Sequence, residues 1–416
     1  MNTGATLGLF EGFGIEIEYM IVERESLNVR PITDELMRAV SGGYECEIEL
    51  GDIAWSNELA LHVVELKTNG PSPTLTGLGA IFQAHVARMN ELLEAFDARL
   101  LPTGMHPWMN TEREFRLWPH EYSLVYATFD RIFGCAGHGW ANVQSTHINL
   151  PFASDAEFAR LHAAIRVVLP IIPGLAASTP VVDGKLTGDL DSRLTFYGGN
   201  AASVPSICGV IIPEPVFSIE AYKKGVLEKI YADLAALDPD GVLRHEWVNA
   251  RGAIARFDRM ALEIRTVDVQ ECPAADIAVT AVIVAAVRWL VEEAWSGTKE
   301  QRRWDHRELA EIHKQVIRDG DTAVIDNKKF LQCFAYPESG KARCSDLWQH
   351  IAESALDKRT LAPDSAAALK VILKQGCLAR RLLAALDGDM SGVHLRDIYA
   401  RAADCLGAGR PFEAPH

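Results

Sequence analysis

Alternation of apolar and acidic positions predicts the first strand of this chain. Residues 13–22 read Phe-Gly-Ile-Glu-Ile-Glu-Tyr-Met-Ile-Val, so Glu16 and Glu18 share one face and the intervening apolar residues share the other. Similar patterns predict further strands over residues 58–68, 144–152 and 260–268. The polar residues that share a face on these strands are Glu65 with Lys67, His147 with Asn149, and Glu263 with Arg265.

Apolar residues that recur every three and four positions predict helices. We expect helices over residues 74–100, 154–172, 274–295 and 364–386. The second of these opens with a capping box, Ser154-Asp-Ala-Glu157. Residues 181–215 are rich in Gly and Pro and weakly periodic, which predicts a long functional loop. Beyond residue 297 the pattern is wholly helical and ends in a loose tail.

The order of these elements indicates the fold class. Strand signals gather before about residue 270, and helices separate them without a strict βαβ rhythm. This favours an α+β fold with a mostly antiparallel sheet. We expect a catalytic domain over residues 1–296 and a helical C-terminal region, 297–416, packed on it.

Composition narrows the possible partners. The 416 residues include 48% hydrophobic and 23% charged residues, as in an ordinary globular protein. The net charge of −15 argues against binding to nucleic acid or to an anionic membrane, because both depend on basic patches. The most apolar stretch, 277–287, is shorter than the roughly 20 residues that a bilayer requires. We therefore expect a buried helix there and no membrane partner.

The eight cysteines include no C-x-x-C pair, which argues against zinc-ribbon and thioredoxin-type sites. Residues 1–11 show no basic stretch ahead of an apolar run, so no secretory signal is expected. Disulfides are then not expected to organise the fold, and the predicted location is the reducing cytoplasm.

Neither of the common phosphate-binding loops, G-x-x-x-x-G-K-[ST] or G-x-G-x-x-G after a strand, is present. A bound nucleotide would have to be held by side chains and metal ions. Glu16 and Glu18 lie two positions apart on one strand face, roughly 6–7 Å along the backbone, which lets them grip one magnesium ion or bridge two.

Each polar position also has a structural interpretation. The two glutamates could line a solvated face, Glu65 could pair with Lys67, Glu263 with Arg265, and His147 could be a satisfied core histidine. Four strands that carry acids or histidine nevertheless favour a site for ions or ligands, because burying so many polar groups is costly without partners.

Six blocks, in order, carry a family resemblance. They are Gly14-Ile-Glu-Ile-Glu18, His62-Val-Val-Glu-Leu-Lys-Thr-Asn69, Gly104-Met-His-Pro107, Thr146-His-Ile-Asn149, Asp191-Ser-Arg193 and Leu262-Glu-Ile-Arg-Thr-Val-Asp268. The set resembles the glutamate–cysteine ligase family, specifically its second type, the bacterial carboxylate–amine ligases. It covers about residues 10–295, and the C-terminal region carries no motif that we can assign.

The resemblance implies a fold shared with glutamine synthetase and the guanidino kinases, in which a curved antiparallel sheet cups ATP and two or more Mg²⁺ ions. The metal ligands it implies are Glu16, Glu18, Glu65 and Glu263. The residues it places beside nucleotide, phosphate or substrate carboxylate are His147, Asn149, Lys67, Arg193 and Arg265. Arg193 would lie in the flexible segment.

The implied reaction passes the γ-phosphate of ATP to a carboxylate, by default the γ-carboxyl of glutamate. An amine, by default cysteine, then displaces phosphate, as in glutathione biosynthesis. Two alternatives stay open, a guanidino-kinase-type phosphotransferase and a non-catalytic scaffold that binds Mg-ATP. Residues 196–203, Phe-Tyr-Gly-Gly-Asn-Ala-Ala-Ser, depart from the bulkier substrate loop that we would expect, so substrate identity stays open.

The expected partners are small molecules, with a homo-oligomer also compatible. The sequence does not indicate which residue would act as the base that deprotonates the amine. The tryptophans at 108, 118 and 140 could line a pocket or belong to the core.

Overall fold

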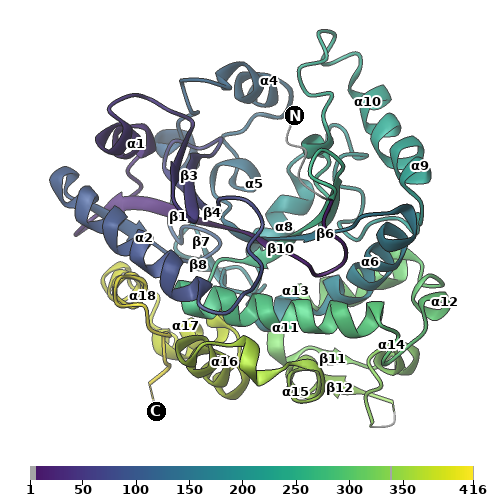
Figure 1. The fold of residues 1–416 in the computed structure, drawn as a ribbon. Helices are drawn as coiled ribbons and strands as arrows, with labels where there is room; N and C mark the ends of the chain where they lie inside the picture. The colour runs from purple at the N-terminus through teal and green to yellow at the C-terminus, as the bar shows by residue number, and fades with distance from the viewer. Residues whose placement is uncertain (1–5, 338–339, 416) are drawn as a thin grey trace.

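An eight-stranded sheet organises the computed structural model, which describes residues 6–337 and 340–415 (Figure 1). Its order is β2-β3-β4-β1-β6-β10-β9, with β5 paired to β1, and each pairing in it is antiparallel. The strands are β1 Gly14–Glu23, β2 Glu47–Leu50, β3 Ile53–Asn57, β4 Val63–Thr68, β5 Ala98–Leu101, β6 Ser145–Pro151, β9 Ala253–Arg256 and β10 Ala261–Asp268. The predicted α+β class with an antiparallel sheet is confirmed.

One face of the sheet is apolar and packs on helices. Ile15 and Ile17 of β1 are fully buried in the main core with residues of α2 (Leu78–Leu93), α6 (Asp155–Val168) and α11 (Pro273–Val291). Ser154 caps α6 as predicted, its hydroxyl accepting the backbone N–H of Glu157. Burial of this apolar face is the main driving force for the fold, and it turns the alternating polar residues to the opposite face.

Helix α11 runs through the centre of the molecule, against α2 and α6 (Figure 1). All of its residues except Arg288 and Trp289 are buried. Within the described residues, α11 is the one helix long and apolar enough to cross a membrane, and 89% of the apolar window is buried inside the protein. The length of residues 277–287 does not by itself exclude a span, because the helix extends beyond them at both ends, but the predicted burial is confirmed.

The C-terminal helices form an outer layer beyond α11 (Figure 1). Helices α15 and α16 contact α11, and α18 contacts α2 and β5. The helices after residue 297 are α12 Thr298–Gln301, α13 His306–Asp319, α14 Lys328–Cys333, α15 Cys344–Ala355, α16 Pro363–Gln375, α17 Leu378–Leu386 and α18 Gly392–Ala408. The main core includes residues from both sides of residue 297. The division into domains there stays a prediction.

The remaining helices before residue 297 are mostly short. They are α1 Thr33–Ser41, α3 Thr111–Glu114, α4 Ser123–Phe133, α5 His138–Ala141, α7 Pro173–Ala176, α8 Ser192–Gly199, α9 Ile219–Tyr222 and α10 Glu228–Leu234. Among these, α4, α5 and α8 contribute residues to a cavity beside the polar cluster, whereas α1 contacts α2, α9 contacts α6, and α7 contacts α13 and α15. Two small hairpins complete the fold, β7 Val181–Val182 with β8 Lys185–Leu186, and β11 Val324–Ile325 with β12 Ala342–Arg343. The last hairpin corrects the expectation of a wholly helical C-terminal region.

Several predicted boundaries were wrong. The strand expected over 58–68 begins only at Val63, and the helix expected over 74–100 is α2, which ends at Leu93. After it, Asp97 turns with a φ of 52°, and β5 pairs with β1. Strands β2, β3 and β9 were missed, because each has only four or five residues and gives little room for an alternating pattern.

The predicted long loop and tail also contain helices. Residues 181–215 include α8, whose first turn is capped by Asp191 accepting the backbone N–H of Leu194. The helix expected over 364–386 is two helices, interrupted at Gly376, where φ is 87°. The loose tail contains α18. All eight cysteines are free thiols, as expected.

Buried neutral histidines predict loss of stability in acid. Burial lowers the pKa of His62 and of His162 to about 3, and neither ring nitrogen of His62 has a hydrogen-bond partner within the described residues. Below pH 6.5 the unfolded chain therefore binds more protons than the folded chain. As the pH decreases from 6.5 to the folded pKa, we expect the free energy of unfolding to decrease by about 1.4 kcal/mol per pH unit for each such histidine.

Urea denaturation at pH 7, 6 and 5 measures this slope. His162→Leu should make the slope shallower by the share of one histidine, whereas His245→Gln, at an exposed position, should leave it unchanged. An identical slope in His162→Leu and wild type would contradict the assignment.

Candidate active site

Strand register gathers the predicted acids on one face of the sheet. Glu16 on β1 lies opposite Lys67 on β4 and opposite His147 on β6. Glu18 lies opposite Glu65, and Glu263 on β10 lies opposite Asn149. Residues that pair across antiparallel strands project from the same face. Four central strands therefore bring together side chains that lie up to about 250 positions apart in the sequence.

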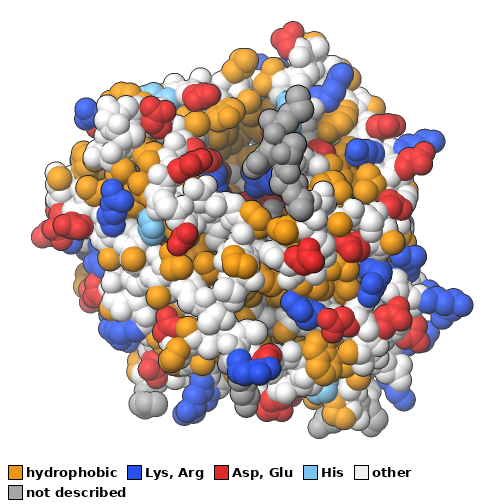
Figure 2. Space-filling view, in the orientation of Figure 1, with side chains coloured by type: hydrophobic (Ala, Val, Ile, Leu, Met, Phe, Trp, Pro, Cys, Tyr) orange, Lys and Arg blue, Asp and Glu red, His pale blue; other side chains and the backbone are white. Residues whose placement is uncertain are grey.

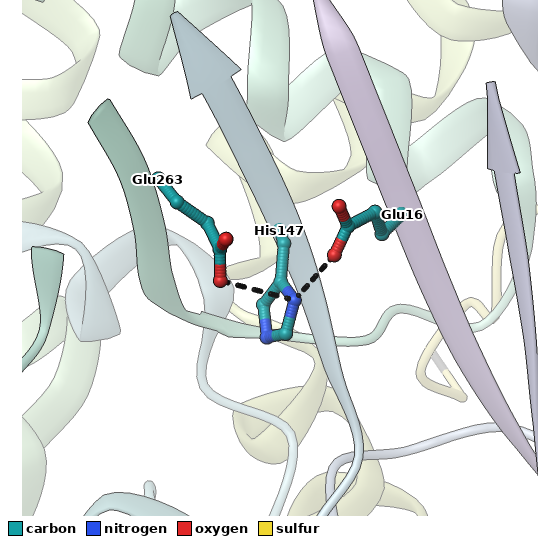
Figure 3. A group of neighbouring side chains, drawn as sticks. All are labelled: Glu16, His147 and Glu263. Carbon is teal, nitrogen blue, oxygen red and sulfur yellow. Dashed lines mark hydrogen bonds and ion pairs between the residues drawn. The ribbon is translucent and has the colours of Figure 1, made fainter. Parts of the chain in front are cut away.

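His147 lies at the centre of this cluster (Figure 3). Its Nδ1 is 2.9 Å from Glu16 Oε2 and 3.8 Å from Glu263 Oε1, so that three neighbouring strands point their side chains toward one another. On its other side, Nε2 is 2.8 Å from Ser145 Oγ and 4.0 Å from Glu18 Oε1. Glu18 is positioned by Ser145, whose backbone N–H donates to Glu18 Oε2 at 2.7 Å.

Two overlapping groups of side chains could each hold a metal ion. Glu16, His147 and Glu263 form one group, and Glu18, Glu65 and His147 form the other, with the ligand atoms of each group within 4.8 Å of one another. The donors are mainly carboxylate oxygens, which Mg²⁺ prefers. The donor set thus fits the predicted magnesium ions, and all four predicted metal ligands belong to it.

The electrostatics of the cluster also favour a cation. Burial and the charge of Glu16 raise the pKa of Glu65 to about 7, although Lys67 and a hydrogen bond from Ser56 oppose the change. This is the response of a carboxylate placed beside another with too little positive charge nearby. A divalent cation between them would relieve the repulsion.

Glu16 and His147 form a charge-assisted pair. Burial acts to raise the pKa of Glu16, but the hydrogen bond and charge of His147, with Arg259, hold it well below its usual range. Burial conversely acts to lower the pKa of His147, but Glu16 and Glu18 outweigh it and the pKa is raised. A metal ion would have to displace the proton of His147, since a ligating histidine is neutral.

The remaining predicted residues border the cluster. Lys67 Nζ lies 2.6 Å from Glu47 Oε2 and 3.4 Å from Glu65 Oε1, which confirms the salt bridge to Glu65. Asn149 Nδ2 donates to Glu16 Oε1 at 3.1 Å. Arg265 Nε lies 3.1 Å from Glu263 Oε1. The ion pairs of Lys67 and Arg265 and the clustering of the predicted site residues are both present, so the structural and the functional interpretations are compatible.

The structural environment of Arg193 differs from the predicted flexible segment. It lies in helix α8, is 2% exposed, and forms an ion pair with the buried Asp268 of β10. Its Nη2 has no hydrogen-bond partner within the described residues, although the side chain lines a cavity beside the cluster. The expectation of a flexible segment here was wrong. Arg193 is instead held in place by helix α8 and by its ion pair with Asp268.

Two cavities flank the cluster. The larger, about 520 Å³, is lined by Glu16, Lys67 and Asn149, by the glycines at 12, 14 and 70, and by the turn at 258–260. The smaller, about 230 Å³, is lined by Glu18, His147, Arg193 and Arg265 together with aromatic side chains. Figure 2 shows the surface hollowed in its upper half, with charged side chains at the margin.

Aromatic residues form the far wall of the smaller cavity. Trp140, Phe129 and Trp247 line it, with the ring of Phe129 5.1 Å from that of Trp140 and 5.8 Å from that of Trp247. Of the three tryptophans noted in the sequence, Trp140 thus lines a pocket and Trp118 is core. Trp108 packs against Tyr399.

The sequence patterns missed several residues of the site. Glu58 lines the smaller cavity, and burial with the charges of Glu18 and Glu65 raises its pKa well above the usual value. Arg256 on β9 lies 2.9 Å from Glu263 Oε2. Glu58 falls in the irregular segment before β4, and β9 was not predicted, so alternation carried no signal for either.

Comparisons with known proteins identify relatives. The model of glutamate-cysteine ligase family 2 matches residues 12–400. An uncharacterized protein of Archaeoglobus fulgidus is 39% identical over 280 residues, 67% of this chain and 75% of that protein. Two solved structures share the fold. A glutamate–cysteine ligase of Francisella tularensis, in complex with AMP, has a TM-score of 0.60 at 12% identity, over 97% of this chain and 89% of its own. A bifunctional glutathione synthetase of Pasteurella multocida has a TM-score of 0.51 at 16% identity, over 95% and 52% respectively.

Proposed function

The chain belongs to glutamate–cysteine ligase family 2, a family of ATP-dependent enzymes that form C–N bonds, and on this premise we propose that it joins a carboxylate to an amine through an acyl phosphate. The carboxylate is by default the γ-carboxyl of glutamate and the amine cysteine, as in the first step of glutathione biosynthesis. ADP and phosphate are the other products.

One observation carries the proposal. The paired acids lie between two cavities, with Glu16 lining the larger and Glu18 lining the smaller, while His147 contacts both carboxylates. A phosphoryl donor in one cavity and a carboxylate in the other would meet across the cluster. Phosphoryl transfer depends mainly on such positioning and on neutralisation of charge.

The larger cavity suits the nucleotide. Three glycines and Lys67 line it, which leaves room for phosphates and supplies a cation. A Cβ at position 14 would lie 3.0 Å from Asn149 Cβ, so a side chain there would press on the residue that orients Glu16. Magnesium ions, when bound, would neutralise the phosphates and polarise the transferred group.

The smaller cavity suits the carboxylate substrate. Arg193 and Arg265 line it and offer planar donors for a carboxylate. Their other bonds, to Asp268 and Glu263, hold the guanidinium groups in place before substrate arrives. Enclosure by Trp140 and Trp247 would exclude water, which would otherwise hydrolyse the acyl phosphate. The free thiols are consistent with a cytoplasmic location.

A matrix of amino acids and amines, incubated with the protein and Mg-ATP, tests the proposal. We expect ADP and free phosphate to appear only when both a carboxylate and an amine are present, with a product whose mass is their sum less water. EDTA should abolish turnover.

Other outcomes would redirect the assignment. ADP formation without free phosphate and without an amine would identify a phosphotransferase. Failure to bind Mg-ATP in calorimetry would leave only a scaffold that has lost its ligand. Turnover with another amine but not with cysteine would keep the ligase class and change only the acceptor.

A further inference from the structure

The turn between β9 and β10 places an arginine at the rim of the larger cavity. Residues 257–260 form this turn, and Arg259 lines the cavity together with Lys67. Its Nη1 lies 3.3 Å from Glu16 Oε1, and 49% of the side chain is exposed. Arg259 therefore reaches a predicted metal ligand from the solvent side, in contrast to the buried Arg193 and the largely buried Arg265.

The backbone of this turn is anchored. Phe257 packs edge-on against Phe152 and Tyr222, with ring centroids 6.3 and 5.8 Å apart. Glu246 Oε2 accepts the backbone N–H of Phe257 at 2.7 Å and that of Asp258 at 3.4 Å. The Arg259 side chain can therefore change partners through its own rotamers while the turn stays in place.

The carboxylate of Glu16 is shared by several partners. His147 contacts Oε2, while Asn149 and Arg259 both donate to Oε1. A divalent cation on this carboxylate would face the positive charge of Arg259 a few ångströms away. Two cations that share one carboxylate repel each other, and a further anion beside them offsets this repulsion. In the larger cavity, the phosphates of a nucleotide would supply that anion.

We propose that Arg259 moves from Glu16 to the nucleotide phosphates when metal and nucleotide bind together, so that it couples their binding. This rests on the proposed function. While paired with Glu16, Arg259 opposes binding of a metal ion alone. Once phosphates are present, the same guanidinium offers them charge-assisted hydrogen bonds. Arg259 thus favours the metal–nucleotide complex over the free metal ion.

Binding measurements on Arg259→Ala test the coupling through two changes of opposite sign. The affinity for Mn²⁺ alone, measured by electron paramagnetic resonance, should rise because the opposing charge beside Glu16 is gone, and an unchanged affinity would overturn the coupling. The affinity for Mg²⁺ with a non-hydrolysable ATP analogue, measured by calorimetry, should fall by at least about fivefold, which is the scale of one lost hydrogen bond. Arg259→Lys should recover part of the nucleotide affinity.

Arg38→Ala is the matched control, because Arg38 is 51% exposed, pairs with Glu35, and lines neither cavity. It should bind both ligands as wild type does. A parallel loss of Mn²⁺ and nucleotide affinity in Arg259→Ala would overturn the inference in favour of a structural role. So would a loss of nucleotide affinity smaller than about fivefold. Failure of the wild type to bind Mg²⁺ with the analogue would instead overturn the proposed function itself.

Discussion

Replacing Glu18 with Gln is expected to lower kcat of the ligase reaction by about 100-fold or more while the chain stays folded. Glu18 belongs to one of the two predicted metal-binding groups, and an amide loses the charge that a magnesium ion requires. The amide oxygen can still accept the backbone N–H of Ser145, so the local structure should survive. Steady-state kinetics, Mn²⁺ binding and thermal denaturation of the variant measure the three effects.

The control is Glu23→Gln, at the end of the same strand. Glu23 bonds with Ser26 and lies near Arg30, outside both cavities. Its variant should keep both turnover and metal binding. Full turnover by Glu18→Gln would remove this carboxylate from the metal site.

Replacing Arg193 with Ala is expected to reduce both stability and turnover. Arg193 and Asp268 form a pair that is almost fully buried, and the variant leaves the carboxylate buried without its cation. Breaking such a pair costs about 3–5 kcal/mol of unfolding free energy. The backbone of Ser178 and the hydroxyls of Ser178 and Thr179 still donate to Asp268, which favours the lower part of this range.

Arg193→Lys separates the two effects. Lysine keeps a cation near Asp268 but lacks Nη2, the unpartnered donor of a side chain that lines the smaller cavity. We expect its urea midpoint to lie between those of wild type and Arg193→Ala, and its KM for the carboxylate substrate to rise. Wild-type KM in Arg193→Lys would confine Arg193 to a structural role. The surface variant Arg38→Ala should change neither quantity.

Local pattern was sufficient for the central strands and their polar faces. In β1 and β10 the predicted sharing of a face by Glu16 with Glu18, and by Glu263 with Arg265, depends only on the two-residue period of an extended chain. Burial of the intervening apolar residues then fixes which face turns inward. Local pattern failed at β5, because a four-residue strand directly after a helix also fits the helical period.

The ordered motifs along the sequence indicated the family and the candidate residues of the site. Only the tertiary structure decided how these residues meet, because strand order is set by long-range pairing. Placing β6 between β1 and β10 puts His147 within reach of Glu16 and Glu263. Arg193 of α8 is buried against Asp268 of β10, and the β9–β10 turn brings Arg259 to Glu16. No periodicity encodes these contacts, since each depends on where a distant segment folds back.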